Sequence, residues 1–406
     1  MTANVRQAAG SLLVVGLGGA GLTELERAWL KLVRPAGIIL FRRNIVDAAQ
    51  TRALLSEASE FCSPQSFRCV DVEGGSVDRL RDALAPMPSA QAVARADARE
   101  RDDRGSRTPT LSQKTRKDGA PGRDPRFPRS QNRDLGHPTE LAYEHGELIA
   151  QAVSAFGFNT TLAPVLDLAL PASAKVMGTR AAATTADGVI EYARGFLGGL
   201  AAHGVVACGK HFPGLGGGTL DSHLETPAIR RSLRELNRED LAPYRELRNE
   251  LPMIMVNHAA YPDTPGGNRP ASASAYWITN VLRKRIGYRG IVFSDDLEMG
   301  GILKFLAIEE AVIAAVRAGM DLMEICHSPE LILRAYASLL AEAERSATFR
   351  DILLARAQQT SLKRKKLLGG EAPAAPSARQ FEALRARIVR YGERIAKAQP
   401  AEAETA

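Results

Sequence analysis

Aromatic residues are scarce in this sequence, since Phe, Trp and Tyr together make up only 5% of its 406 residues. So low a content disfavours a wide binding cleft lined by stacking aromatic side chains and favours a small pocket. The four cysteines are scattered and form no Cys-x-x-Cys pair, which argues against a metal cluster and for reduced thiols. Apolar runs are short as well, and none has the length of a signal peptide or of a membrane-spanning helix. We therefore expect a cytoplasmic protein with no metal, no cofactor and no membrane contact.

The net charge of +7 is unevenly distributed along the chain. Residues 95–134 hold 12 Lys and Arg and 7 Asp and Glu, a net of +5, in a stretch rich in Pro, Gly and Ser. This composition predicts a disordered or weakly ordered insertion over residues 95–137. Because most of the basic excess lies there and not on a folded face, we expect no nucleic-acid partner. A nucleic-acid-binding protein that acts through the insertion stays an alternative.

Short apolar, β-branched runs alternate with amphipathic helical patterns over most of the chain. Near-continuous apolar strands of this kind indicate a parallel sheet that helices cover on both faces. The predicted strands lie near residues 12–17, 37–41, 67–73, 160–168, 205–212, 252–258, 290–296 and 319–326. Eight is the strand number of a (β/α)8 TIM barrel, which is the α/β fold that we predict for residues 1–368. The pattern alone also permits an open doubly wound sheet.

Residues 369–406 are predicted to form a linker and a helix. Ser377 and Gln380, after a Pro-rich stretch, have the spacing of a helix-capping box. The apolar residues that follow lie on one helical stripe, at Phe381, Leu384, Ile388, Tyr391 and Ile395. Such a helix can pack on the barrel, pair with another chain or fray, so the sequence leaves the oligomeric state open.

A glycine-rich turn at residues 16–21 (GLGGAG) follows the first predicted strand and precedes a helix that Thr23 and Glu26 can cap. This context is that of a dinucleotide-binding fingerprint, so an NAD(P)-binding oxidoreductase is the alternative from a different class of enzyme. The acidic residue expected at the end of the second strand is missing, because Arg42 and Arg43 follow that strand. A tight turn between strand and helix is therefore the preferred interpretation.

Polar residues stand at several predicted strand ends, where barrel enzymes place their site residues. The segment 210–214 (KHFPG), which holds Lys210 and His211, ends the fifth strand and leads into a glycine-rich loop with Asp221 and His223. A carboxylate beside an imidazole can fix its tautomer and raise its pKa, which makes a general acid/base. For an Asp-x-His triplet alone, two surface residues that never meet are the more frequent explanation, and the preceding segment changes that balance.

The seventh strand ends in the adjacent carboxylates Asp295 and Asp296. Neighbouring side chains at a strand end point in different directions, so one of the two can attack an anomeric carbon while the other has a structural role, such as capping the next helix. Asp71 closes the third strand before two glycines, and His258 ends the sixth. Each of these two is either a site residue or a core residue, and the convergence of several polar strand ends favours a site.

These residues carry a family resemblance. The chain resembles the single-domain bacterial β-N-acetylglucosaminidases of glycoside hydrolase family 3. The matching stretches are residues 35–44 (PAGIILFRRN), 70–80, 162–168 (LAPVLDL), 210–229, 253–274 and 291–299 (IVFSDDLEM). The specific feature is the Lys-His-Phe-Pro-Gly segment combined with Asp-Ser-His. The family pattern has a second histidine where this sequence has Leu215.

The resemblance implies a retaining hydrolase that releases terminal β-linked N-acetylglucosamine, often in peptidoglycan recycling. It implies Asp295 as the nucleophile, His223 as the acid/base and Asp221 as the partner of that histidine. The residues implied to contact the sugar are Asp71, Arg180, Lys210 and His211, with His258 as a further strand-end histidine of the pattern. The expected partner is a small carbohydrate, either an N-acetylglucosaminide or a muropeptide. A family 3 phosphorylase, a β-glucosidase and an inactive barrel are the nearest alternatives.

Overall fold

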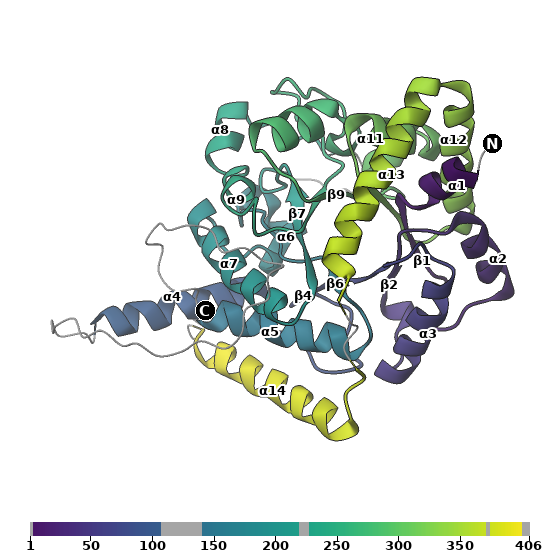
Figure 1. Cartoon of the computed structure of the whole chain (residues 1–406). Coiled ribbons are helices and arrows are strands. Elements are labelled where there is room, and N and C mark those ends of the chain that lie inside the picture. Colours follow the sequence, from purple (N-terminus) through teal and green to yellow (C-terminus); the bar gives the residue numbers. More distant parts are fainter. Residues whose placement is uncertain (1–2, 107–139, 219–226, 371–373, 400–406) are drawn as a thin grey trace, which may run out of the picture.

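The computed structural model of the chain describes residues 3–106, 140–218, 227–370 and 374–399. Eight parallel strands close into a barrel in the order β1-β10-β9-β8-β7-β6-β3-β2, and helices surround it (Figure 1). The predicted TIM barrel is therefore confirmed. The barrel strands are β1 (Leu13–Gly16), β2 (Gly37–Leu40), β3 (Phe67–Val70), β6 (Thr160–Thr161), β7 (Val206–Phe212), β8 (Met253–Val256), β9 (Ile291–Asp296) and β10 (Leu322–Ile325).

Helices alternate with the strands along the chain. The longer ones are α1 (Ala3–Gly10), α2 (Glu24–Val33), α3 (Ala48–Glu60), α4 (Ala90–Ser106), α5 (Glu140–Ala155), α7 (Ala186–Ala202), the π-helical segment η5 (Tyr276–Arg285), α11 (Ile308–Ala318), α12 (Pro329–Arg345), α13 (Ala347–Leu368) and α14 (Ala378–Lys397). The predicted capping box of Thr23 and Glu26 is present at the start of α2. Within the described residues, every helix is too short or too polar to cross a membrane.

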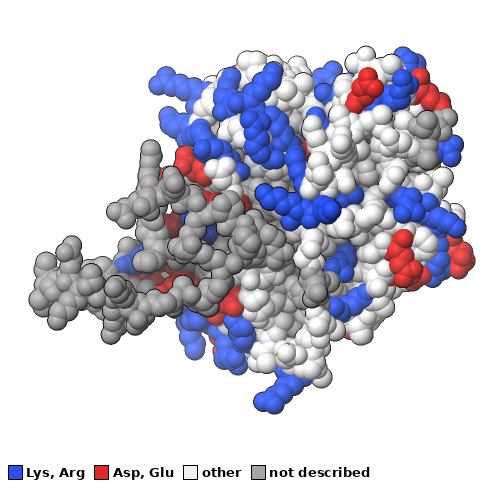
Figure 2. Space-filling view, in the orientation of Figure 1, with Lys and Arg blue, Asp and Glu red and all other residues white. Residues whose placement is uncertain are grey.

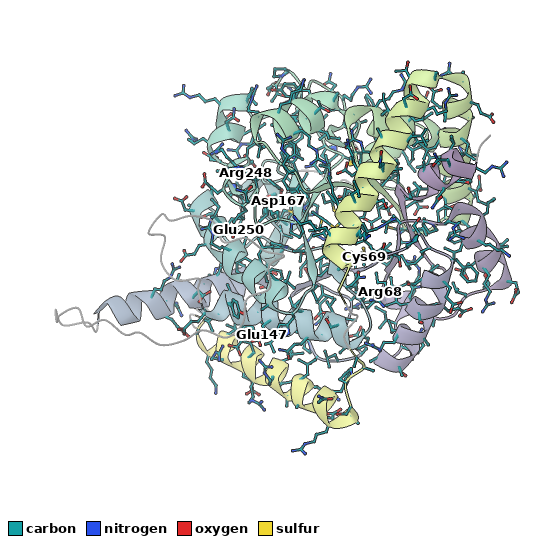
Figure 3. All side chains as sticks on the ribbon, viewed as in Figure 1. Arg68, Cys69, Glu147, Asp167, Arg248 and Glu250 are labelled. Atoms are coloured by element: carbon teal, nitrogen blue, oxygen red, sulfur yellow. The ribbon has the colours of Figure 1, made fainter. Side chains whose placement is uncertain are left out.

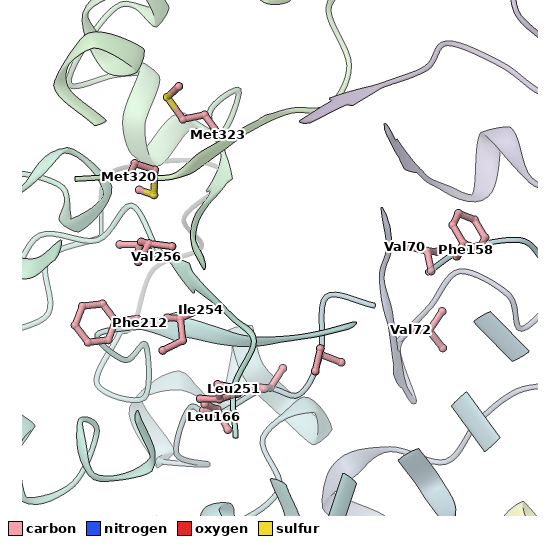
Figure 4. Close-up of a cluster of buried hydrophobic side chains, with 14 of the residues drawn as sticks. Val70, Val72, Phe158, Leu166, Phe212, Leu251, Ile254, Val256, Met320 and Met323 are labelled. Carbon is pink, nitrogen blue, oxygen red and sulfur yellow. The ribbon is translucent and has the colours of Figure 1, made fainter. Parts of the chain in front are cut away.

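Apolar side chains fill both the inside of the barrel and the space between barrel and helices. Val14, Ile39 and Phe293 belong to the inner cluster. In the outer cluster, Phe212 and Val256 are among the side chains that pack between strands and helices (Figure 4). A parallel barrel needs strands that are apolar on both faces, which is why the strand runs of this sequence are nearly continuous.

Two predicted strands are shorter than their apolar runs. β6 covers only Thr160–Thr161, because Pro164 lacks the N–H that a longer ladder needs. The run at residues 67–73 divides at Asp71, where β3 ends, and β4 (Val72–Gly74) pairs with β5 (Val77–Asp78) in a separate two-stranded sheet. Asp71 therefore stands at a break in the chain direction, at the carboxyl end of a barrel strand.

The prediction of a disordered stretch from residue 95 onward is wrong for its first part, because residues 90–106 form α4. Ala96 and Asp97 are buried. The carboxylate of Asp97 accepts the N–H groups of Leu141 and Ala142 at the start of α5, at 3.2 and 3.0 Å. Contacts distant in sequence thus order a segment whose composition suggests disorder. The remainder of the predicted insertion, residues 107–137, lies outside the described residues.

The predicted helix near the end of the sequence is confirmed, and it packs on the outer ring of the barrel. Ser377 and Gln380 form the predicted capping box of α14. Four stripe residues, Leu384, Ile388, Tyr391 and Ile395, are buried. The helix lies along α5, where the hydroxyl of Tyr391 donates to the carbonyl of Leu141 at 2.8 Å (Figure 1). Of the three arrangements left open by the sequence, packing on the barrel is the one observed.

Basic side chains on the described surface are not confined to one place. On the face shown in Figure 2, Lys and Arg are spread over many elements, with acidic side chains among them. This is the pattern of an ordinary solvated surface, whereas a nucleic-acid-binding face concentrates positive charge in a patch or stripe. The face in view gives the nucleic-acid alternative no support.

His145 on α5 is fully buried beneath α14, in a cluster of aromatic rings. Its Nδ1 lies 3.0 Å from the hydroxyl of Tyr192, and the rings of Phe196 and Tyr391 pack against it. Burial lowers the pKa of His145 from 6.5 to about 3. His145 therefore takes up a proton near pH 6.5 in the unfolded chain but stays neutral at this pH in the folded chain. Because the unfolded chain binds more protons, acid should favour unfolding.

We expect His145→Gln to weaken this acid sensitivity. From pH 7 to about pH 4.5, the buried neutral histidine should cost the wild type about 2–3 kcal/mol of unfolding free energy that the variant does not lose. Urea unfolding at the two pH values measures the difference. His203→Gln is the matched control, because His203 is only half-buried beside Glu147. Equal acid sensitivity of wild type and His145→Gln would contradict the assignment.

Candidate functional site

A pocket of about 600 Å³ opens at the carboxyl ends of the barrel strands. Its polar lining includes Asp71, Arg180, Lys210, His211, Asp295, Asp296 and Glu324. The structure thus brings together five of the predicted site residues, which come from the ends of β3, β7 and β9 and from the 3-10 helical segment η3 (Gly178–Arg180). This is the end of a TIM barrel at which enzymes hold their active sites.

Asp295 lies at the end of β9, and one of its carboxylate oxygens accepts the N–H of Asp296 at 2.9 Å. Burial alone would raise the pKa of Asp295. His211, His258, the N–H of Asp296 and Lys210 together outweigh burial and hold this pKa below its ordinary value. Asp295 is therefore an ionised carboxylate at neutral pH, with the pocket in front of it, and it is chemically able to act as a nucleophile.

Asp296 has different surroundings although it is the next residue. Its Oδ1 accepts the N–H of Glu298 at 3.0 Å, within the turn that leads to the short helix α10 (Gly300–Leu303). Burial raises the pKa of Asp296 to about 7. This agrees in part with the structural role expected for Asp296, although its side chain also lines the pocket. The two neighbouring carboxyl groups thus differ in pKa and in hydrogen-bond partners.

Four charged side chains form a network of ion pairs beside Asp295. Lys210 donates to Asp71 at 2.8 Å and to Glu73 at 2.7 Å. Arg180 donates two parallel hydrogen bonds of 2.8 Å to the carboxylate of Glu73. Burial would raise the pKa of Glu73, but Arg180 and Lys210 hold it far below its ordinary value. Glu73 is therefore ionised, and the side chains of Lys210 and Arg180, which line the pocket, can bind oxygen atoms of a ligand.

We expect Lys210→Met to destabilise the protein by about 3–5 kcal/mol, because it leaves Asp71 and Glu73 short of a cation in a buried setting. Urea unfolding measures the loss. Lys175→Met is the control, since Lys175 is an exposed lysine at the mouth of the same pocket and should change stability by less than about 0.5 kcal/mol. If the two variants lost the same stability, the network would not hold this end of the barrel.

Asp167 positions His211, and its place in the sequence did not mark it as a site residue. Its Oδ2 lies 2.6 Å from Nδ1 of His211, and its Oδ1 accepts the N–H of Leu215 at 2.6 Å. The side chain of Asp167, which is labelled in Figure 3, is completely buried. It therefore fixes both the imidazole and the loop that follows β7. The available signal was an acid within the apolar segment 162–168, which was used for the family resemblance and not for the site.

Glu324 on β10 is a second pocket residue that the sequence analysis missed. It is only 2% exposed, and the thiol of Cys326 donates to its Oε1 at 3.3 Å. Burial, and then the negative charges of Asp296, Asp71 and Asp295, raise the pKa of Glu324 well above its ordinary value. It is thus a neutral carboxylic acid on the pocket wall. In the sequence, Glu324 is a single acid within a short apolar strand, so nothing there marked it as a site residue.

His258 lies behind the pocket wall. Its Nδ1 is 2.7 Å from the hydroxyl of Ser272, and its Nε2 is 2.9 Å from the carbonyl of Asp296. The structure therefore places this histidine where it supports the Asp295–Asp296 turn. His223 and Asp221 lie outside the described residues, so their expected pairing has no geometry to report.

One group of side chains near the pocket has the donor atoms of a metal site. Asp296, Glu298 and His327 offer ligand atoms that all lie within 4.8 Å of one another. Both oxygens of Glu298, however, accept backbone N–H groups, from Cys326 at 3.1 Å and from Ser328 at 2.7 Å. Glu298 therefore ties the turn after β9 to the turn after β10, which explains the group without a metal.

The glycine-rich turn at residues 16–21 is held by side chains of its own chain. The N–H of Gly18 donates to Glu26 at 2.8 Å. Asn44 donates to the carbonyls of Leu17 and Gly19, at 3.0 and 2.9 Å. A pyrophosphate would need such an N–H for itself. The turn therefore has the structural role that the sequence analysis preferred, and the oxidoreductase alternative has no support here.

Comparisons with known proteins place the chain among sugar-cleaving enzymes. A family model described as the glycosyl hydrolase family 3 N terminal domain matches residues 5–351. The chain is 34% identical over 321 residues to a beta-hexosaminidase of Alkalilimnicola ehrlichii, over 79% of this chain and 82% of that protein. It is 33% identical over 330 residues to a beta-hexosaminidase of Pseudomonas aeruginosa, over 80% of this chain and 86% of the relative.

Two solved structures share the fold. One is a glycoside hydrolase family 3 beta-N-acetylglucosaminidase from Paenibacillus sp. str. FPU-7, with a TM-score of 0.77 and 28% identity over 97% of this chain and 69% of that one. The other is NagZ from Neisseria gonorrhoeae in complex with N-trifluoroacetyl-D-glucosamine, with a TM-score of 0.69 and 26% identity over 94% of this chain and 98% of that one.

Proposed function

The chain belongs to glycosyl hydrolase family 3, as its motifs predict, and we propose that it releases terminal β-linked N-acetylglucosamine through a covalent glycosyl-enzyme on Asp295. The observation that carries this proposal is the setting of Asp295, an ionised carboxylate at the end of β9 that lines a pocket with cationic and polar groups. Attack by this carboxylate on the anomeric carbon gives a glycosyl-enzyme, and water then cleaves it with retention of configuration. The beta-hexosaminidase relatives support the choice of sugar.

The acid/base in this proposal is His223, with Asp221 as its partner. A histidine can give a proton to the leaving oxygen and then take one from water, provided that a carboxylate holds it in the right tautomer. The loop that carries both residues begins at the end of β7, and Leu215 in its first part lines the pocket. The roles of His223 and Asp221 are assigned from the family resemblance.

Three members of the ion-pair network, together with His211, provide the contacts to the sugar. Asp71 accepts hydrogen bonds from hydroxyl groups, while Lys210, Arg180 and His211 donate to their oxygens. All four side chains line the pocket. They are already fixed by one another and by Asp167, so binding a sugar requires little further ordering. His258 acts through the turn that carries Asp295.

The mouth of the pocket suits an anionic aglycone. Arg42, Arg79 and Lys175 line it, and the side chain of Lys175 is exposed to solvent. Carboxylates of a muropeptide would meet these cations. We therefore include turnover of peptidoglycan fragments in the cytoplasm in the proposal.

The test is to trap the glycosyl-enzyme with a fluorinated N-acetylglucosaminyl donor and to sequence the labelled peptide. The label should be found on Asp295. Labelling of another carboxylate would overturn the assignment of the nucleophile, and turnover of aryl glucosides in preference to N-acetylglucosaminides would overturn the choice of sugar. Running the reaction with and without phosphate separates hydrolysis from phosphorolysis, because a sugar 1-phosphate as the main product would identify a phosphorylase.

A further inference from the structure

A groove of about 620 Å³ lies at the end of the barrel where the strands begin, opposite the pocket. It is bordered by α1, by α13 and by the turn between α3 and β3. α1 and α13 pack side by side (Figure 1). Ser11, which precedes β1, and Ser63, which precedes β3, belong to the lining and fix this location. The proposed function makes no use of the groove.

Arg364 on α13 stands out within this groove. It is only 3% exposed, and among the described residues that line the groove it is the only charged one. Its Nε and Nη1 are buried and have no hydrogen-bond partner, and neither has the buried hydroxyl of Thr360, one helical turn earlier. Cys62 lies close enough to interact electrostatically, but burial raises the pKa of this thiol to about 12, so it carries no negative charge at neutral pH.

A buried guanidinium without an acidic partner calls for a counter-ion. Arginine keeps its proton in proteins, so burial cannot neutralise the side chain. A buried charge without a partner is costly, and buried polar groups in folded proteins nearly always have one. The groove offers further uncharged hydrogen-bonding groups, from Gln7, Gln358 and Ser361. Guanidinium and amide donors without a competing carboxylate are the set that recognises an oxyanion.

We propose that this groove binds a small oxyanion of the size of phosphate, held by Arg364 with help from the amides of Gln7 and Gln358. The anion is either free or carried as the phosphate ester of a larger molecule, for which the groove has room. A ligand there connects α1 with α13 and stabilises the end of the barrel opposite the catalytic pocket. The competing explanation is that Arg364 has only a packing role beside α1 and the turn after α3, with no ligand.

Thermal unfolding of the full chain in chloride and in phosphate buffers of equal ionic strength tests this site. Saturating phosphate should raise the unfolding midpoint of the wild type by about 2 °C or more, and Arg364→Met should abolish the increase. Lys365→Met is the matched control, because it removes the same charge from the next, exposed residue of α13 and should keep the increase. In chloride, Arg364→Met should be at least as stable as the wild type, because it removes an unpaired buried charge.

The outcomes separate the two explanations. A wild type that phosphate does not stabilise beyond chloride, or an Arg364→Met variant that phosphate stabilises equally, overturns the proposal. A loss of stability on Arg364→Met in chloride assigns Arg364 a packing role and overturns the anion site. If that variant does not fold, the phosphorus NMR signal of phosphate is measured with the wild type instead. The wild type should broaden this signal, and sulfate should reverse the broadening. Absence of broadening overturns the site. A larger midpoint increase with a sugar phosphate than with phosphate would identify a phosphate ester as the source.

Discussion

Replacement of Asp295 by Ala should lower the turnover of an aryl N-acetylglucosaminide by about four orders of magnitude or more. The carboxylate forms the covalent bond to the sugar, so no other group of the pocket can take over its step, and losses of this size are typical for a removed nucleophile. The pocket itself should remain, because the Asp295 side chain accepts a hydrogen bond from the N–H of its own neighbour, whereas Lys210, Arg180 and Asp167 are held by other partners. Steady-state kinetics on the purified variant measures the loss.

Two further measurements sharpen this prediction. Azide is small enough to enter the space left by the carboxylate, so it should restore part of the activity of Asp295→Ala and give a glycosyl azide of inverted configuration. Asp296→Asn is the matched control, because it changes the neighbouring carboxyl group, whose pKa is about 7 and whose Oδ1 accepts the N–H of Glu298. Full activity of Asp295→Ala, or an equal loss in both variants, would contradict the mechanism.

Replacement of His223 by Ala should lower turnover by about a hundred- to ten-thousand-fold, the usual contribution of a general acid/base. The loss should depend on the leaving group. A dinitrophenyl glycoside needs no proton for departure, so its first step should be nearly unaffected, whereas a sugar or alkyl leaving group should suffer the full loss. Comparison of kcat/KM over a series of leaving groups measures this dependence.

Asp221→Ala should cost less than His223→Ala, because it removes the residue that orients the histidine and not the proton carrier itself. Measured on the same series, it should show the same trend with smaller losses. A loss in His223→Ala that is equal for all leaving groups would assign His223 to binding and leave the acid/base to be found elsewhere.

The barrel could be predicted because its signals are local. Each strand is a short apolar run, and several helices begin at a local capping residue, as at Thr23 and Ser377. The first part of the predicted insertion was misjudged for the opposite reason. α4 is rich in Arg and Asp, and it is ordered by Asp97, which binds N–H groups of α5 more than forty positions further along the chain. Composition contains no information about such a partner.

For the site, the sequence predicted only those residues that stand as polar groups at the ends of apolar strands. A polar residue at a strand end marks the right edge of the barrel, but it does not tell whether the side chain points into the pocket or behind its wall. Lys210 lines the pocket, whereas His258 is held by Ser272 and the Asp296 carbonyl. Asp167 and Glu324 were missed because each is an acid inside an apolar segment, where only the closed barrel shows what surrounds it.

The neutral state of Glu324 has a consequence for inhibitors. Asp295 is ionised and Glu324 is protonated, and the two are close enough for the charge of one to affect the other. The pocket therefore offers a site for a cationic nitrogen and, separately, an O–H group for a hydrogen-bond acceptor. A compound that carries both should select this chain over relatives without an acid at this position. Its advantage should vanish wherever Glu324 loses its proton, because a carboxylate accepts hydrogen bonds and no longer donates one.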